Sequence, residues 1–317
     1  MKRFLIIQTA FIGDVILATA LVESIAQKFP DAKIDFLLRK GNENILENNP
    51  HIHEVIIWDK KSKWKSFWQV IKKLRTETYD QSITLQRFFS AALITLLIRS
   101  HKKSVFSNSP LSFLHRDKKP HIWGDGTHEI ERNHQLLGSN FPVSKPKVYP
   151  SEEDQQQIVQ YQNEPYLVMA PNSVWFTKTL PINKWVELIR QLGNQKIYLI
   201  GAPSDHPVCE SIADQARNNV DNLAGQLSLL QSAALMQGAV MNYVNDSAPL
   251  HLCSATNSPV TAFFCSTTEK FGFGPLSDQS NVLEKLDLEC KPCGKHGHKS
   301  CPRGHFKCSE IPLNEAL

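Results

Sequence analysis

Short apolar runs alternate with longer stretches of helical periodicity along the chain. A first series of strand-like runs covers residues 4–8, 34–38, 55–58, 82–85 and 103–106. A second series covers residues 166–170, 197–201, 239–244 and 260–264. Strands that alternate with helices in this way predict parallel sheets with helices on both faces. The sequence therefore predicts an α/β protein with two doubly wound parallel sheets.

The segment between the two series, residues 141–150, contains Pro142, Pro146 and Pro150, which forbid a helix there. A chain of 317 residues is too long for a typical single core and suits two domains. We therefore place the domain boundary in this segment. We expect a first domain over residues 1–148, a second over residues 149–289 and a Cys/His-rich tail over residues 290–317.

Residues 10–15 and 245–251 each follow a strand-like run and precede a helical pattern, so each lies at the carboxyl end of a strand. Ligands bind at this edge of an open α/β sheet, because the loops there line a crevice and the next helix presents unpaired backbone N–H groups. Two such edges suggest two sheets that face one central cleft.

The helical pattern that follows residue 58 carries aromatic and basic side chains together. Trp64, Phe67, Trp68, Ile71 and Leu74 recur at helical spacing. We predict that this aromatic stripe packs on the sheet and that the neighbouring lysines are solvated. Contact with a membrane surface is the alternative interpretation.

The composition narrows the class of protein. Apolar residues make up 41% and charged residues 21%, as in an ordinary globular protein, and 35 basic against 31 acidic side chains leave a net charge of +4. This small charge gives no support to nucleic-acid binding. Neither half contains the glycine motif of a nicotinamide site or of a P-loop, which disfavours a Rossmann-type dehydrogenase.

The first residues look like a signal peptide, but Gln8, Asp14 and Glu23 interrupt the apolar core that such a segment needs. The nearest candidate for a membrane helix, residues 91–98, is far shorter than the ~18 apolar residues required. We therefore expect a cytoplasmic protein.

Four of the seven cysteines gather near the end of the chain, interleaved with three histidines; they are Cys290, Cys293, Cys301 and Cys308. Thiolates and imidazoles at close spacing can hold a structural zinc ion, but this spacing is not that of a standard zinc finger. We prefer a reduced tail that packs against the domains, or a redox-sensitive pair, and expect no metal. A zinc-dependent nucleic-acid module is the alternative.

Four segments, in order, match one family. They are residues 11–15, residues 171–173 with 178–181 and Trp185, residues 201–205, and residues 245–252. In these motifs the chain resembles the bacterial ADP-heptose:lipopolysaccharide heptosyltransferases of glycosyltransferase family 9. The resemblance extends from the first strand to the cysteine-rich tail, in the order and spacing of the family.

The resemblance implies a GT-B glycosyltransferase with two Rossmann-like domains. It implies that the first domain binds most of the acceptor and the second most of the nucleotide sugar. It implies that heptose moves, with inversion, from ADP-heptose to the inner core of lipopolysaccharide, without a metal ion or other cofactor. The implied partners are the nucleotide sugar and a lipid-linked lipopolysaccharide precursor at the inner face of the cytoplasmic membrane. We expect a monomer that is peripheral to this membrane face.

Sugar transfer needs a base that takes the proton of the acceptor hydroxyl. Asp14 follows the first strand, where Gly13 allows close approach of backbone and substrate, and it resembles the catalytic base of the family. A helix N-cap is the structural alternative for this aspartate. We assign Gly13 and Lys63 to acceptor binding.

A cation has to stabilise the departing diphosphate, and Lys178 is the candidate because it follows the strand at 166–170 by a short loop. Ser173 in the same loop can hydrogen-bond a phosphate or the sugar. By resemblance, Asp205 holds the ribose and Leu227 contacts the adenine. The structural alternatives are an exposed loop lysine, a turn aspartate and a core leucine.

Asp246, Ser247 and Ala248 open a helix whose N–H groups and dipole favour a diphosphate. By resemblance, Asp246 contacts sugar hydroxyls or positions the loop, and His251 lies beside the phosphates. The alternatives are an N-cap for Asp246 and a hydrogen-bonded core position for His251.

Two positions depart from the family pattern, since Asn172 and Ala248 stand where glycine is usual. If Ala248 required a positive φ, alanine would cost about 1 kcal/mol or more there. The donor loop would then differ in shape. This departure motivates the alternative function, a GT-B protein that binds another nucleotide sugar or lacks turnover.

Overall fold

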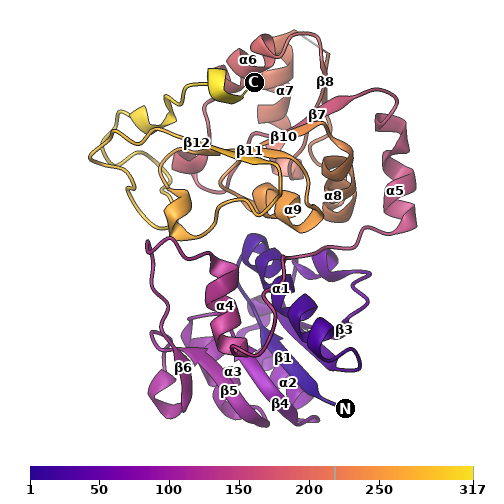
Figure 1. The fold of residues 1–317 in the computed structure, drawn as a ribbon, viewed down its shortest axis with the longest axis vertical. Helices are drawn as coiled ribbons and strands as arrows, with labels where there is room; N and C mark the ends of the chain where they lie inside the picture. Colours follow the sequence, from indigo (N-terminus) through magenta and orange to yellow (C-terminus); the bar gives the residue numbers. More distant parts are fainter. Residues whose placement is uncertain (218, 317) are drawn as a thin grey trace. The chain divides into compact units, whose positions relative to one another are not determined.

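The computed structural model describes residues 1–217 and 219–316, and the side chains of Ser62 and Lys63 are outside this description. The chain forms two compact units (Figure 1). Unit 1 comprises Met1–Trp123 and Thr127–Tyr149, and unit 2 comprises Gly124–Gly126 and Pro150–Leu317. Residues 141–150 contain neither helix nor strand, and the absence of a helix agrees with the prediction from their prolines.

Unit 1 is built on one parallel sheet with the strand order β3-β2-β1-β4-β5-β6. Its strands are β1 (Arg3–Ile7), β2 (Lys33–Arg39), β3 (Ile52–Trp58), β4 (Tyr79–Thr84), β5 (Ser100–Phe106) and β6 (Asp117–Lys119). Its α-helices are α1 (Ile12–Lys28), α2 (Lys63–Leu74), α3 (Phe89–Leu97) and α4 (Glu129–Leu137). Ile6 in the central strand β1 lies opposite Phe36 of β2 and Ile83 of β4.

Unit 2 is built on a second parallel sheet, with the order β12-β11-β10-β7-β8-β9. Its strands are β7 (Tyr166–Ala170), β8 (Lys196–Leu199), β9 (Val220–Asn222), β10 (Met241–Asn245), β11 (Val260–Phe264) and β12 (Ser280–Glu284). Its α-helices are α5 (Glu152–Ile158), α6 (Ile182–Gln191), α7 (His206–Ala216), α8 (Leu229–Gly238) and α9 (Ala248–Thr256). The predicted pair of doubly wound sheets is therefore confirmed.

Each sheet reverses its strand order once, between β1 and β4 in unit 1 and between β7 and β10 in unit 2. In open α/β sheets, ligands bind outside the carboxyl ends of the strands at this reversal point, because the connections leave it in opposite directions. The loops after β1, β4, β7 and β10 are therefore the places where functional side chains are expected.

The strands that the sequence analysis missed, β6, β9 and β12, are edge or near-terminal pieces with short, polar sequences such as Asp-Lys-Lys and Val-Asp-Asn. β6, β9 and β12 stand at sheet edges. Edge strands carry polar side chains because they border solvent, so they lack the apolar run that marks a central strand.

Helices α2 and α3 cover one face of the sheet of unit 1, where their apolar residues join a core cluster with β1, β2, β3 and β4. Phe67, Ile71 and Leu74 of α2 are buried there, as predicted. Trp64 and Trp68 are instead 67% and 56% exposed, so the prediction that they pack on the sheet is wrong. At 100° per residue they lie roughly 70° and 110° from the centre of the buried side of the helix.

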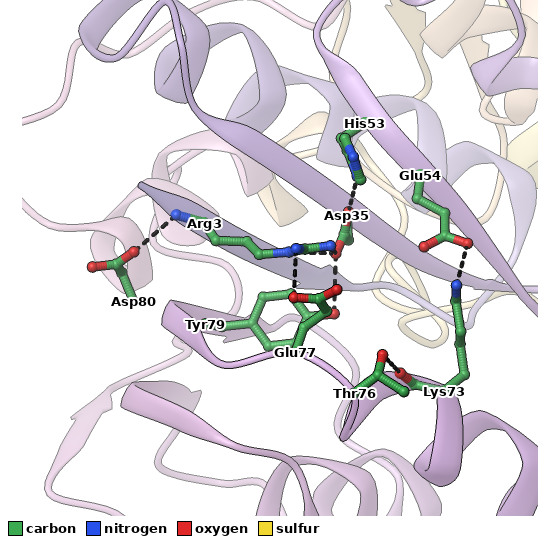
Figure 2. A network of polar contacts seen from close by, with 9 residues as sticks. All are labelled: Arg3, Asp35, His53, Glu54, Lys73, Thr76, Glu77, Tyr79 and Asp80. Carbon is green, nitrogen blue, oxygen red and sulfur yellow. Dashed lines mark hydrogen bonds and ion pairs between the residues drawn. The ribbon is translucent and has the colours of Figure 1, made fainter. Parts of the chain in front are cut away.

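A buried charge network joins four strands of unit 1 near their amino ends (Figure 2). Asp35 of β2 is 1% exposed, and Arg3 of β1 donates to its Oδ2 at 3.0 Å. The Tyr79 hydroxyl donates to the same oxygen at 3.1 Å, and His53 Nδ1 lies 2.9 Å from Oδ1. A buried carboxylate is tolerated only when it is paired and hydrogen-bonded, so this network ties β1, β2, β3 and β4 together.

Among the described helices, none is both long enough and apolar enough to cross a membrane.

Candidate active site

The turn between β1 and α1 presents Asp14 at the carboxyl end of the central strand of unit 1. Phe11 is the N-cap residue of α1, and Gly13 and Asp14 follow in the first turn. The N-cap alternative for Asp14 is therefore wrong. A carboxylate in the first turn is favoured by the helix dipole, and the side chain is partly exposed, so it can meet a substrate.

Side chains that follow β2 and β3 hold the backbone just before Asp14. Lys60 Nζ donates to the carbonyl oxygen of Thr9 at 2.9 Å, and Asn42 Nδ2 donates to that of Ala10 at 2.9 Å. Burial lowers the pKa of Lys60. Because Asn42 and Lys60 follow β2 and β3, three adjacent strands fix the turn that carries Asp14.

Gly13 and Lys63 are the residues assigned to acceptor binding. Gly13 lies beside Asp14 in α1. Lys63 begins α2, and its side chain lies outside the described residues. The role of Lys63 stays a prediction.

The sequence analysis missed Arg87, which lies in the loop after β4, across the reversal point from Asp14. Burial lowers the pKa of the guanidinium, while the carboxylates of Glu129 and Asp14 act to raise it. Arg87 Nη1 is 3.0 Å from His121 Nδ1, and the guanidinium carbon lies 5.2 Å from the ring centre of Trp123. A half-buried cation thus stands in the electrostatic range of Asp14.

His121 connects Arg87 to helix α4. Its Nε2 lies 3.0 Å from Glu129 Oε2, and Arg132 Nη1 donates to the same oxygen at 3.0 Å. Since a guanidinium has only N–H donors, His121 Nδ1 accepts from Arg87 and Nε2 carries the proton toward Glu129. This neutral tautomer orients Arg87. The sequence signal that could have identified Arg87 is its position directly after a strand at the reversal point.

In unit 2 the loops after β7 and β10 bring Lys178 and Asp246 together. Lys178 Nζ lies 2.7 Å from Asp246 Oδ2, and their side chains are 16% and 6% exposed. The Thr267 hydroxyl donates to the same carboxylate oxygen at 2.6 Å. The N-cap alternative for Asp246 and the exposed-loop alternative for Lys178 are therefore both wrong. Both charged side chains are largely buried, and burial of two charges is tolerated when each neutralises the other.

Asn245, the last residue of β10, fixes the loop that carries Lys178. Its side-chain oxygen accepts the N–H of Leu180 at 3.0 Å, and its Nδ2 donates to the carbonyl oxygen of Pro171 at 2.7 Å. Both ends of this loop are thus tied to the strand that precedes Asp246. The sequence analysis counted Asn245 in a motif but gave it no role of its own.

A helix begins here as predicted: α9 starts at Ala248, with Ser247 as N-cap and Pro249 in its first turn. Asn172 and Ala248 are absent from the non-glycine residues with positive φ in the described part of the chain. The strain considered for alanine at 248 is therefore absent. The first N–H groups of a helix have no intrahelical partner, so this end of α9, beside Asp246, suits an anion.

His251 and Ser173 complete the surroundings of this helix end as predicted donor-binding residues. His251, one turn into α9, is 6% exposed, and its ring centre lies 6.2 Å from that of Phe273. The Ser173 hydroxyl oxygen accepts the N–H of Trp175 at 3.4 Å, which leaves the hydroxyl hydrogen to serve as a donor. Their contacts with a donor stay predictions.

Asp205 follows β8 in the short 3₁₀ helix Pro203–Asp205, and its Oδ2 accepts the N–H of Ala202 at 2.8 Å. A Cβ atom on Gly201 would lie 2.8 Å from this oxygen, so only glycine fits there. Asp205 thus has the turn role considered for it, with ribose binding still a prediction. Leu227 is half-buried outside the core, so the core-leucine alternative is wrong.

The tail holds the Lys178 loop through backbone contacts. The Thr177 N–H donates to the carbonyl oxygen of His298 at 3.1 Å, and the His298 N–H donates to the Thr177 hydroxyl at 2.8 Å. The rings of Phe176 and Phe306 have centres 4.9 Å apart. The expected packing of the tail is confirmed for its contact with this loop.

The tail cysteines carry free thiols. Within the described residues, no three His, Cys, Asp or Glu side chains are grouped so that they could hold a metal ion. Although partial burial opposes it, the pKa of Cys301 is lowered by backbone N–H groups that point at its sulfur, among them that of Phe306 at 3.4 Å. Burial raises the pKa of Cys308 to about 11.

Known proteins are similar to this chain in sequence and in fold. The sequence model of glycosyltransferase family 9 (heptosyltransferase) matches residues 67–302. Lipopolysaccharide heptosyltransferase 3 of Escherichia coli K12 is 27% identical over 82% of this chain and 81% of that protein. The family 9 glycosyl transferase of Veillonella parvula superposes with a TM-score of 0.81 at 20% identity, covering 90% of this chain and 86% of that one.

The E. coli heptosyltransferase WaaC with ADP superposes with a TM-score of 0.72 at 23% identity, over 88% of this chain and 93% of that one. These likenesses agree with the GT-B class of fold expected from the two doubly wound sheets. Since the family model covers well over half of the sequence, the chain belongs to glycosyltransferase family 9, the heptosyltransferases.

Proposed function

We propose that this protein transfers heptose, with inversion, from ADP-heptose to the inner core of a lipopolysaccharide precursor. The observation that carries the proposal is the buried pair of Lys178 and Asp246 beside the amino end of α9, at the reversal point of the second sheet. A cation next to a helix N-terminus is a site for a diphosphate. The name of the E. coli relative, lipopolysaccharide heptosyltransferase, supports the sugar and the acceptor class.

Unit 1 supplies the base and unit 2 binds the donor in this proposal. Asp14 takes the proton of an acceptor hydroxyl while the oxygen of that hydroxyl bonds to the anomeric carbon of heptose. The bond from that carbon to the β-phosphate oxygen breaks, and its electron pair leaves with ADP. Attack opposite to the leaving group inverts the anomeric configuration.

Lys178 and the first N–H groups of α9 stabilise the negative charge that develops on the leaving diphosphate. Asp246 positions Lys178 and accepts hydrogen bonds from the sugar hydroxyls, and Ser173 donates to a phosphate or to the sugar. Asp205 takes the ribose with the carboxylate oxygen that Ala202 does not engage, and Leu227 lies against the adenine.

Arg87 gives unit 1 a second group for the acceptor. It is held by His121 and Trp123 and stands near Asp14. His121 engages one N–H group of the Arg87 guanidinium. The other N–H groups can bind a carboxylate or phosphate of the acceptor in a fixed geometry. Such an anchor would place the acceptor hydroxyl against the base.

The acceptor is lipid-linked, so we place the enzyme at the inner face of the cytoplasmic membrane, acting as a peripheral monomer without a metal ion. Lys178 and α9 provide positive charge for the diphosphate, which is the service that a divalent cation supplies in other transferases. The alternative, a GT-B protein with another donor or without turnover, is not favoured, because Ala248 lies in an unstrained helix.

The test is Asp14→Asn, assayed with ADP-heptose and a purified acceptor. Loss of a general base lowers turnover by about 10²–10⁴-fold, so we expect kcat to fall in this range. ADP affinity should stay unchanged, because the nucleotide binds to unit 2. Asp31→Asn, an exposed aspartate beyond α1, is the control and should keep normal turnover. Near-normal transfer by Asp14→Asn would exclude Asp14 as the base.

A further inference from the structure

Helix α2 exposes two tryptophans on one side. Trp64 and Trp68 are 67% and 56% exposed, although large aromatic side chains are usually buried. They are four residues apart, so their indoles project from the same side of the helix. Phe67 is buried and meets both rings edge-on, with ring centres 5.9 and 5.5 Å away. The two indoles therefore rest on the core as one supported pair.

The same helix is strongly basic. Helix α2 together with the three residues before it, 60–74, contains six lysines and no acidic side chain. Lys73 is engaged by Glu54 at 2.9 Å, but Lys65 and Lys72 are exposed and follow the tryptophans around the solvent side of the helix. Indole rings flanked by lysines are typical of helices that lie in the headgroup region of an anionic membrane.

The helix that carries the exposed pair begins at the carboxyl edge of the sheet. Helices α2 and α3 cover the same face, and each begins at the carboxyl edge of the sheet, where Asp14 lies. Phe88 and Phe89 at the start of α3 are each 59% exposed, and Phe11 before Asp14 is 53% exposed. Apolar rings thus gather at the edge that carries the proposed base.

We propose that the exposed side of α2, formed by Trp64, Lys65, Trp68 and Lys72, docks on an anionic lipid surface. This inference rests on the proposed function, because a lipid-linked acceptor is presented at such a surface. The indoles enter the headgroup layer while the lysines meet lipid phosphates. Docking by this side brings the edge of unit 1 with Asp14 close to the membrane.

The experiment is co-sedimentation of the full-length protein with phosphatidylcholine vesicles that do or do not contain phosphatidylglycerol. We expect binding to the anionic vesicles only. Trp64→Ala/Trp68→Ala should weaken it about tenfold or more through lost apolar contact. Each of Lys65→Gln and Lys72→Gln should weaken it about fivefold and make it less sensitive to salt. These side chains are exposed, so the thermal midpoint should not change.

The matched control is Phe113→Ala, which removes an aromatic ring that is 73% exposed. Phe113 precedes β6, and β6 is the outer strand on the other side of the sheet from β3, the strand that α2 follows. The control variant should bind vesicles like the parent protein. Equal loss in this control, or normal binding by the tryptophan variants, would overturn the assignment to α2. A concentration-dependent dimer that the tryptophan variants abolish would overturn it too, because a second copy would then cover the helix.

A second assay separates this inference from the proposed function. Transfer to an acceptor without acyl chains should proceed equally in the parent and in Trp64→Ala/Trp68→Ala, while transfer to vesicle-borne acceptor should fall in the variant. If the parent transfers to neither acceptor, the proposed function is wrong, yet the vesicle measurement still decides the docking surface. If the variant loses transfer to both acceptors equally, the tryptophans serve the site and not docking.

Discussion

Lys178 and Asp246 form a buried ion pair that is better suited to function than to stability. Replacing such a pair with apolar residues is often neutral, because desolvation of both charges offsets their attraction. Removing one partner is costly, because the other charge stays buried alone. Here the Thr267 hydroxyl also donates to the carboxylate of Asp246, which leaves Lys178 able to share its charge with a bound diphosphate.

We therefore predict that a second substitution at Asp246 separates stability from activity. Lys178→Met should lower the free energy of unfolding by about 3 kcal/mol, because it leaves the Asp246 carboxylate unpaired, and should weaken donor binding and turnover together. Adding Asp246→Asn should recover most of the stability and none of the activity. Denaturant unfolding and donor kinetics on both variants check this. Recovery of turnover in the double variant would show that Lys178 does not serve the diphosphate.

The sequence predicted Asp14, Lys178 and Asp246 as site residues from two sources, their positions at the carboxyl ends of parallel strands and the resemblance to the family. The sequence analysis missed Arg87 and the contacts that orient it. His121 lies against Arg87, and Glu129 lies against His121. These residues meet only when helix α4 packs beside β5 and β6. Contacts between side chains distant in sequence leave no periodic signal, so a single chain does not reveal them.

At the scale of elements, the tail is a brace for the Lys178 loop. Gly297 has φ +78°, and a Cβ atom there would lie 3.0 Å from Trp175 Cβ and 3.1 Å from Lys178 Cγ. The tail backbone therefore approaches the loop as closely as glycine permits. The sequence analysis considered its cysteines and histidines as metal ligands, whereas the hydrogen bonds that join it to the loop come mostly from backbone N–H and carbonyl groups. Such groups have no sequence signature.

Two glycines of the tail allow a matched test. Gly297 and Gly304 both have positive φ, at +78° and +73°, but a Cβ atom on Gly304 would meet nothing within 4 Å. Alanine at either position should cost about 1 kcal/mol in backbone strain. Only Gly297→Ala should also displace the Lys178 loop and raise the KM for ADP-heptose several-fold. Equal KM values for the two variants, measured at saturating acceptor, would contradict the bracing role.

At the scale of the whole molecule, the two units repeat one plan, a parallel sheet that carries the proposed site residues in the loops at its carboxyl edge. The central strands were predictable, because burial on both faces demands continuous apolar runs. At the amino edge of unit 1, hydrogen bonds and an ion pair join the strands; they involve Arg3, Asp35, His53 and Tyr79 (Figure 2). A network that lies away from the proposed site should therefore affect stability without affecting the binding of nucleotide.

Calorimetry of two variants tests this division. Arg3→Met removes the guanidinium that pairs with the buried Asp35 carboxylate and should destabilise unit 1 by about 3 kcal/mol. Lys2→Met removes the ion pair with Asp80, in which the side chains are 54% and 33% exposed, and should change stability by less than about 0.5 kcal/mol. ADP at 100 times its Kd should add about 2.7 kcal/mol to unit 2. We expect Arg3→Met to lower one thermal transition and ADP to raise the other; if ADP raises the transition that Arg3→Met lowers, the nucleotide does not bind to unit 2 alone.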